Sequence, residues 1–166
     1  MKRLILTISF LLLNSIIAQE ISVDTVWTKT FGGSGYETAW STQQTIDGGY
    51  IITGSTGPFG NGNSDVYLIK TDSNGDSLWT RTFGGIESDY SNSVQQTTDG
   101  GYIITGNTYS YGNGESDVWL IKTDSQGREE WNKTFGGSNY DVGRSVQQAT
   151  DAVSYTHLTL PTNREV

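Results

Sequence analysis

The segment Asp47-Gly-Gly-Tyr-Ile-Ile-Thr-Gly54 decides the fold, because the same eight residues return unchanged as Asp99–Gly106. A second motif keeps the same spacing. The sequence W-T-[KR]-T-F-G-G begins at Trp27 and at Trp79, and W-N-K-T-F-G-G begins at Trp131. Successive copies of both motifs lie 52 residues apart, with no insertion between them.

The repeat divides the chain into units. Residues 27–78 and 79–130 are complete units with 32 of 52 positions identical, and residues 131–151 are a truncated third unit. A fixed period of this kind means that one supersecondary unit is copied. The copies are expected to stack and bury a continuous core between them.

Each unit predicts four β-strands, because short apolar runs alternate with Gly- and Asp-rich turns. Asp-Gly favours a tight hairpin turn in which both central residues have positive φ, so we expect such turns at Asp47–Gly49 and Asp99–Gly101. The expected strands of the second unit are Ser93–Thr97, Tyr102–Thr108, Asp117–Thr123 and Glu130–Phe135.

The run Val66-Tyr-Leu-Ile69 is apolar at consecutive positions, which indicates a strand covered on both faces. A four-stranded sheet stacked between copies of itself predicts an all-β fold, a β-propeller fragment with two complete four-stranded antiparallel blades plus flanking strands. A β-solenoid usually repeats at shorter intervals, and a sandwich does not repeat. We expect Ile52 and Leu68 to be buried between blades. We expect Val26–Phe31 to be a fourth strand that closes the ring with a blade outside this chain.

Residues 1–18, MKRLILTISFLLLNSIIA, have the organisation of a signal peptide. Lys2 and Arg3 form the basic region, Leu4–Leu13 the apolar region, and Ala18 is the small residue at the cleavage site. The mature chain then begins at Gln19, and the apolar run is too short for a comfortable membrane span. This predicts a secreted or cell-surface protein with no membrane span after cleavage.

The repeat ends abruptly at Asp151. Gly-Gly-Tyr-Ile-Ile is expected next, but residues 152–166 read AVSYTHLTLPTNREV and match the unit at no offset. This tail resembles a translated sequencing adapter, so we interpret it as non-native. The authentic mature region is then 19–151, and no function is assigned to the single histidine, His157.

Composition narrows the classes of function. The chain has 166 residues, 34% of them hydrophobic, with 21 glycines and a formal net charge of −8. This charge repels phosphate backbones and argues against nucleic-acid binding. The chain has no cysteine, so disulfides, thiolate metal sites and cysteine nucleophiles are excluded.

The motifs W-x-[KR]-T-F-G-G, D-G-G-Y-I-I-T-G and S-D-V-[YW]-L-I-K-T-D resemble the repeats of secreted bacterial β-propeller proteins, over residues 27–151. Many of those proteins end in a C-terminal sorting domain for type IX secretion. The resemblance implies export and a propeller, and it implies no particular activity.

Candidate binding residues lie where the longer loops are expected. In a propeller, the loops that join strand two to strand three and strand four to the next blade share one face, and binding usually involves such loops. Two acidic positions recur on this face. The candidates are Glu37, Asp89 and Asp141 at one repeat position, Asp65 and Asp117 at another, and Tyr111 in a loop. These acids either form hydrogen bonds within turns or make a ring of carboxylates for cations or polar glycans.

Two functions of different classes fit the sequence. The first is a scaffold that binds an extracellular glycan or protein, with no catalytic residue, cofactor or metal expected. The second is a propeller enzyme, either a glycan-acting hydrolase or a quinone-dependent dehydrogenase, since Leu68–Trp79 is similar to the structural repeats of the latter. Within 19–151 no serine has a histidine to pair with, whereas a carboxylate pair for glycoside hydrolysis needs only Asp or Glu.

Overall fold

The computed structural model describes residues 3–4, 21–22, 27–57 and 63–149. These residues form strands and turns, and among them there is no helix long and apolar enough to cross a membrane. Most of the expected signal peptide and the tail 152–166 lie outside the described residues. The strands are β1 (Arg3–Leu4), β2 (Ile21–Ser22), β3 (Tyr36–Gln44), β4 (Tyr50–Gly57), β5 (Asp65–Thr71), β6 (Ser77–Phe83), β7 (Asp89–Gln96), β8 (Tyr102–Thr108), β9 (Asp117–Thr123) and β10 (Glu129–Phe135).

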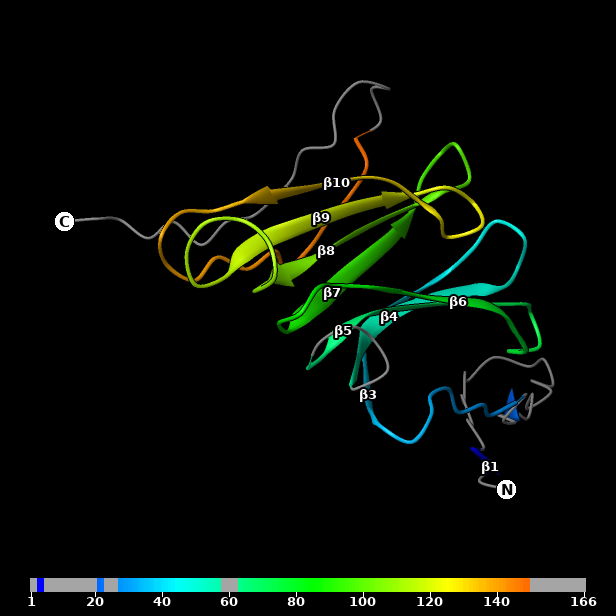
Figure 1. The fold of residues 1–166 in the computed structure, drawn as a ribbon. Helices are drawn as coiled ribbons and strands as arrows, with labels where there is room; N and C mark the ends of the chain where they lie inside the picture. Colours follow the sequence, from blue (N-terminus) through cyan, green and yellow to red (C-terminus); the bar gives the residue numbers. More distant parts are fainter. Residues whose placement is uncertain (1–2, 5–20, 23–26, 58–62, 150–166) are drawn as a thin grey trace, which may run out of the picture.

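The architecture is all-β, as expected. Strands β3 to β6 form one four-stranded antiparallel sheet in sequence order, and β7 to β10 form a second. The short strands β1 and β2 pair separately. The second sheet lies over the first, and β7 runs along the side of the second sheet that faces β3, β4 and β5 (Figure 1).

The predicted strands are largely confirmed. β8 and β9 match the expected second and third strands residue for residue, whereas β7 begins at Asp89, four residues before the expected start at Ser93. A bulge between Ser91 and Ser93 shifts the pairing of β7 with β8. An inserted residue of this kind breaks the alternation of buried and exposed side chains, so the sequence pattern hides the first half of the strand.

The hairpin turns differ from expectation in their backbone. Only the glycine has positive φ, at 83° in both Gly48 and Gly100, while the preceding aspartate does not. Gly48 N donates to Thr45 O at 2.9 Å, and the Asp47 carboxylate accepts a hydrogen bond from Gly49 N at 3.0 Å. The turn is therefore an ordinary β-turn followed by a left-handed glycine, and the aspartate acts through its side chain.

The core lies between the two sheets. Leu68 is fully buried, as expected, and belongs to a cluster drawn from both sheets. Ile52 is only half-buried in this structure, and its burial between blades of the full-length protein stays a prediction. Neighbouring residues of a strand point to opposite faces, and no described sheet covers the face of the first sheet that carries Ile52. The buried members of the cluster are Ile51, Val66, Leu68, Val94, Tyr102, Ile104, Trp119 and Ile121.

The paired glutamines of the repeat hold successive units together. Gln96 N donates to Gln43 Oε1 at 2.7 Å, and Gln148 N donates to Gln95 Oε1 at 2.5 Å. Both bonds join residues 53 positions apart, so the same side-chain contact recurs at the next junction. These bonds set the position of each unit's first strand against that of the preceding unit.

Residues 27–31, the described part of the expected closing strand Val26–Phe31, form no strand in this structure, and their pairing with a blade outside this chain stays a prediction. Val26 itself lies outside the described residues. A β-strand needs a backbone partner, and the described residues contain no sheet that supplies one here. The segment instead lies on the first sheet through side chains, with the Trp27 ring 5.6 Å from the Tyr50 ring.

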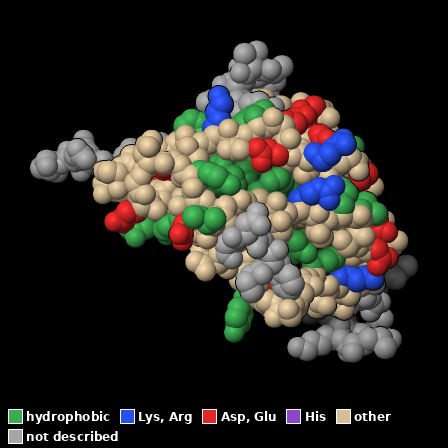
Figure 2. All heavy atoms as spheres, viewed as in Figure 1, with side chains coloured by type: hydrophobic (Ala, Val, Ile, Leu, Met, Phe, Trp, Pro, Cys, Tyr) green, Lys and Arg blue, Asp and Glu red, His purple; other side chains and the backbone are tan. Residues whose placement is uncertain are grey.

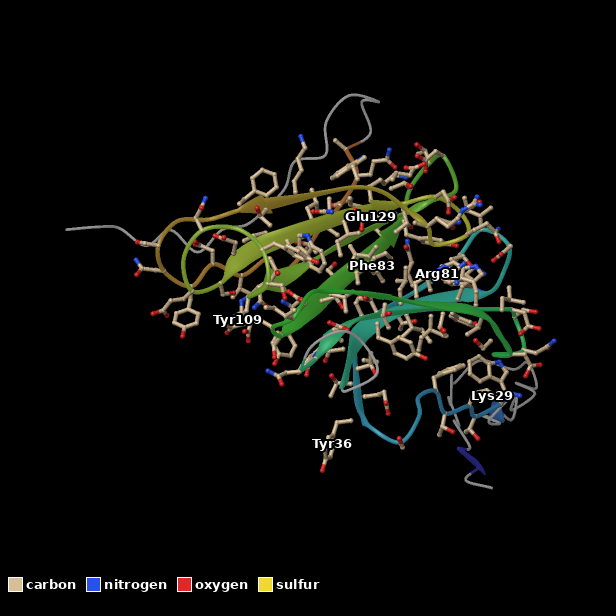
Figure 3. All side chains as sticks on the ribbon, viewed as in Figure 1. Lys29, Tyr36, Arg81, Phe83, Tyr109 and Glu129 are labelled. Carbon is tan, nitrogen blue, oxygen red and sulfur yellow. The ribbon has the colours of Figure 1, made fainter. Side chains whose placement is uncertain are left out.

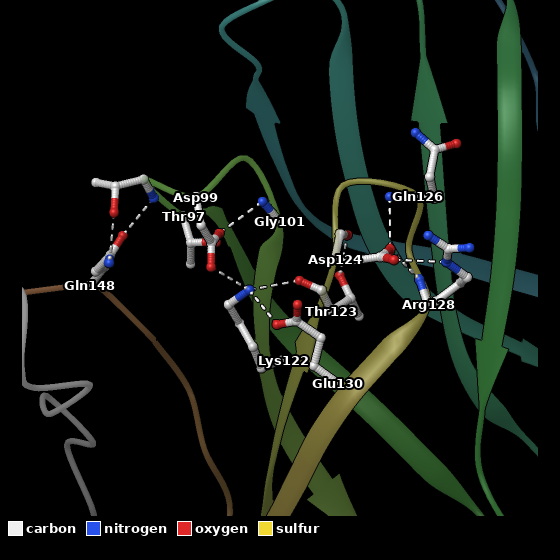
Figure 4. A network of polar contacts seen from close by, with 11 residues as sticks. Thr97, Asp99, Gly101, Lys122, Thr123, Asp124, Gln126, Arg128, Glu130 and Gln148 are labelled. Carbon is white, nitrogen blue, oxygen red and sulfur yellow. Dashed lines mark hydrogen bonds and ion pairs between the residues drawn. The ribbon is translucent and has the colours of Figure 1, made fainter.

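A buried lysine lies beside the Asp-Gly-Gly turn of each sheet, and Figure 4 shows the one in the second sheet, Lys122. Lys122 is 1% exposed and its ammonium group donates to Thr123 O at 2.7 Å and to Glu130 Oε2 at 2.9 Å, while Asp99 Oδ2 lies 2.9 Å away. Lys70 forms the corresponding ion pair with Asp47 in the first sheet. Buried charges of this kind are stable only when they are paired and hydrogen-bonded.

Acid is expected to weaken these turns. Hydrogen bonds from Thr45 and Lys70 lower the pKa of Asp47 to about 2; in Asp99, burial opposes the shift, but hydrogen bonds from Thr97 and Lys122 still lower the pKa to about 2. A carboxyl group whose pKa is lowered in the folded state stabilises the fold above about pH 4. This stabilisation is lost as the pH falls toward 2. Urea unfolding should therefore show a shallower acid dependence in the variant D47N/D99N than in the native chain. Equal slopes between pH 4 and pH 2 would contradict the prediction.

Candidate functional site

The longer loops lie at the end of the sheets where β5, β7 and β9 begin (Figure 1). We call this end, with loops 84–88, 109–116 and 136–140, the loop end. Its backbone crosses from unit to unit: Asp89 N donates to Ser64 O at 2.6 Å, and Asp141 N donates to Ser116 O at 2.7 Å. The structure therefore brings the predicted candidates to one end of the molecule.

Asp89 is completely buried and organises two of these loops. Its carboxylate accepts hydrogen bonds from Thr108 Oγ1, from Ser110 Oγ at 2.7 Å and from Gly85 N at 2.8 Å. These donors come from the loop after β6 and from the end of β8. Both carboxylate oxygens are thus engaged within the protein.

Asp65 and Asp117 are also buried, at 2% and 3% exposure. The Asp117 carboxylate accepts a hydrogen bond from Asn113 N in the loop before β9. Its Oδ1 atom would lie 1.9 Å from a Cβ at Gly136, and Asp65 Oδ1 would lie 2.0 Å from a Cβ at Gly84. The first glycine of each Phe-Gly-Gly motif is therefore required because a carboxylate packs directly against it.

Glu37 and Asp141 occupy the repeat position of Asp89 and are half-buried. Asp141 Oδ2 accepts a hydrogen bond from Gly137 N at 2.9 Å, which corresponds to the bond from Gly85 N to Asp89. Glu37 Oε1 lies 3.5 Å from Thr56 Oγ1. Asp89 and Asp141 therefore stabilise the preceding Gly-Gly loop, whereas the hydrogen bond of Glu37 is to Thr56 in β4.

Tyr111 connects the loop after β8 to the loop after β6 and to β9. Its hydroxyl donates to Gly84 O at 2.9 Å, and its ring centroid lies 5.3 Å from that of Trp119. Burial, followed by the negative charges of Asp89, Glu129 and Asp65, raises the pKa of Tyr111. The side chain is 46% exposed, so one side of the ring faces solvent.

Three of the predicted acids are thus buried within the loop structure, while tyrosine side chains are exposed at the same end. Asp65, Asp89 and Asp117 would have to leave their present contacts to reach a ligand in solvent. Among the residues that the structure describes, no group of three or more His, Cys, Asp or Glu side chains is placed to hold a metal ion.

Three tyrosines meet at the loop end, and we call them the tyrosine patch: Tyr90 in β7, Tyr109 after β8 and Tyr140 after β10. The Tyr109 ring centroid lies 6.3 Å from that of Tyr90 and 6.2 Å from that of Tyr140. Tyr109 is 41% exposed and Tyr140 is 57% exposed. Figure 3 shows Tyr109 at this end, while Tyr36 projects alone into solvent.

Sequence reasoning missed the tyrosine patch, although a signal was present. Tyr90 stands where the first unit has Thr38, and Tyr109 stands where it has Gly57. Side chains that recur at every 52nd position are explained by the repeated fold. Exposed aromatic residues that break the repeat are not, and these departures from the consensus were the available signal.

The charged side chains seen at the loop end are acidic, whereas Lys and Arg lie on other parts of the surface in view (Figure 2). In Figure 2, Lys and Arg side chains lie away from the end where β8 meets β9, and the charged groups seen at that end are acidic. Glu87 and Glu115 are exposed residues of its loops. The loop end therefore combines exposed tyrosines with carboxylates.

No protein-family model matches the chain. No curated protein matches it either.

Proposed function

We propose that the chain is part of a secreted β-propeller that acts as a binding or adhesion scaffold and carries out no catalysis. One observation carries the proposal: the contact between the two sheets is reproduced by the segments that flank them. Trp79 of β6 packs against Tyr102 in the second sheet, with ring centroids 5.8 Å apart. Trp27, one repeat earlier, packs against Tyr50 in the first sheet at 5.6 Å.

The packing of one unit on the preceding one is also repeated on the other face of the second sheet. Residues 141–148 lie on the second sheet as β7 lies on the first, since the bonds from Gln148 to Gln95 and from Asp141 to Ser116 copy the bonds one unit earlier. Each sheet is thus built to contact a neighbour on both faces. A closed ring of blades is the architecture that satisfies this for every unit.

An open hollow on the first sheet fits the same arrangement. The hollow has a volume of about 420 Å³, and Ile52, Tyr67 and Ile69 are among the residues that line it. Their repeat equivalents in the second sheet, Ile104, Trp119 and Ile121, are buried against the first sheet. A preceding sheet of the same chemistry would fill the hollow.

A scaffold role is favoured over catalysis by the use of the acids at the loop end. Asp89 and Asp117 hold loops in place through hydrogen bonds, which yields a rigid surface on which exposed side chains can bind a partner. Export by the N-terminal segment would place this surface outside the cell.

Binding without turnover tests the proposed function. The processed chain should bind an extracellular polysaccharide or surface protein with a saturable isotherm, and polysaccharides incubated with it should release no reducing sugar. Release of sugar at a rate proportional to protein concentration would instead favour the hydrolase.

Export is tested independently. When the full chain is expressed in a Gram-negative host, the exported protein should begin at Gln19, because Ala18 is the small residue that precedes the expected cut. N-terminal sequencing of the periplasmic or secreted fraction measures this. Recovery of the protein only in the cytoplasm, with Met1 retained, would contradict it.

A further inference from the structure

Two members of the tyrosine patch, Tyr90 and Tyr109, depart from the sequence of the first unit. Thr38 replaces Tyr90 in the first unit, and its hydroxyl pairs with Ser55 Oγ at 2.8 Å. Gly57 replaces Tyr109. The first sheet forms without these aromatic rings, so their presence in the second unit needs another reason.

The rings are held by contacts among the loops of the loop end, and those of Tyr109 and Tyr140 still face solvent. Tyr109 N donates to Ser88 O at 3.1 Å, which fixes the start of loop 109–116 against the loop before β7. The Tyr109 ring then meets Tyr90 and Tyr140 at interplanar angles of 83° and 66°. Edge-to-face contacts of this kind stabilise the rings in one arrangement while leaving parts of their faces open.

The patch also has a polar partner. Ser116 and Tyr140 form an isolated parallel bridge, which brings the neighbouring Glu115 close to Tyr140. Hydrogen bonding to Glu115, followed by its negative charge, raises the pKa of Tyr140. Glu115 is exposed, so its carboxylate is accessible to a ligand. Apolar ring faces beside a few fixed polar groups are typical of sites for small polar ligands.

Pyranose sugars are complementary to such a site. Their C–H faces lie flat on aromatic rings, and their hydroxyls donate to carboxylates and phenols. The chain carries a net charge of −8, and the charged side chains of the loop end in view are acidic (Figure 2). An anionic polymer would be repelled, which leaves uncharged glycans as the favoured class.

We propose that the tyrosine patch, together with Glu115, is a binding site for an uncharged polysaccharide. This inference rests on the proposed scaffold function and names its ligand class and its site. The tyrosines contact the sugar rings directly, and Glu115 accepts hydrogen bonds from sugar hydroxyls.

The test measures retardation of the processed chain in gels that contain glucan, mannan, xylan or galactan, with alginate as an anionic probe. The native chain should be retarded by at least one uncharged polymer and not by alginate. The variant Y109A/Y140A should weaken that binding at least tenfold, and Glu115→Gln should weaken it several-fold. Tyr36→Ala is the matched control, since Tyr36 shares the repeat position of Tyr140 but is 91% exposed and outside the patch.

The outcomes separate the two proposals. Retardation that is unchanged in Y109A/Y140A, with a native thermal melt, would overturn the site but keep the scaffold. If Y109A/Y140A melts abnormally, Glu115→Gln decides, because it alters only an exposed side chain. Failure of all four polymers to bind, or binding to alginate or to a protein alone, would overturn the ligand class. Sugar release would overturn the scaffold function itself.

Discussion

Replacing Ile104 by alanine is expected to lower the free energy of unfolding by about 2–5 kcal/mol, the usual cost of truncating a buried aliphatic side chain. Ile104 is 1% exposed and lies in the core between the two sheets. The cavity left by the truncation would be enclosed by Leu68 and Trp119, which belong to the same cluster. The surrounding strands are hydrogen-bonded on both sides and have little freedom to close it.

The matched control is the same substitution one repeat earlier. Ile52 has the same neighbours in sequence but lines the open hollow on the first sheet. Ile52→Ala should therefore cost less than about 1.5 kcal/mol, because little enclosed cavity forms. Urea midpoints followed by tryptophan fluorescence would measure both variants. Equal losses would show that the face of the first sheet that carries Ile52 is covered in solution.

Replacing Asp89 by alanine is expected to lower the free energy of unfolding by about 3 kcal/mol or more. The substitution removes the acceptor for Thr108 Oγ1, Ser110 Oγ and Gly85 N at once. Each buried donor left without a partner costs about 1–3 kcal/mol. The loops after β6 and β8 should also become more accessible to proteases, since Asp89 is one of the contacts that join them.

Glu87→Ala is the control for Asp89→Ala. Glu87 is an exposed acid in the same loop, so its loss should change the free energy of unfolding by less than about 0.5 kcal/mol. Limited proteolysis and urea unfolding would be compared for the two variants. If Asp89→Ala behaves like Glu87→Ala, the carboxylate does not organise the loops, and a ligand-binding role for Asp89 regains support.

The structure differs from the sequence analysis in the bounds of strands that depend on their pairing partners. β8 and β9 were predictable because Asp99–Gly101 and a continuous apolar run mark their bounds. The early start of β7 was hidden by the bulge near Asn92. Residues 27–31 have strand-like sequence, but no strand in the described part of the chain pairs with them.

The candidate site was predictable in its location and not in its chemistry. The repeat and the parity of antiparallel strands sufficed to place Asp65, Asp89 and Tyr111 at one end. The burial of Asp89 could not be read from the sequence, because it depends on loop 109–116 folding back over β7. The meeting of Tyr109 with Tyr140 likewise joins residues of different units.

The sequence by itself determined that this chain is an all-β protein made of a 52-residue repeat, since identical local sequences fold into identical strands and turns. Tertiary structure alone decided which side chains are available at the loop end. Exposure is a property of how neighbouring units pack. Asp89 and Asp117, which stand at acidic positions of the repeat, are buried and accept hydrogen bonds from loop residues, while Tyr109, which departs from the repeat, is left facing solvent.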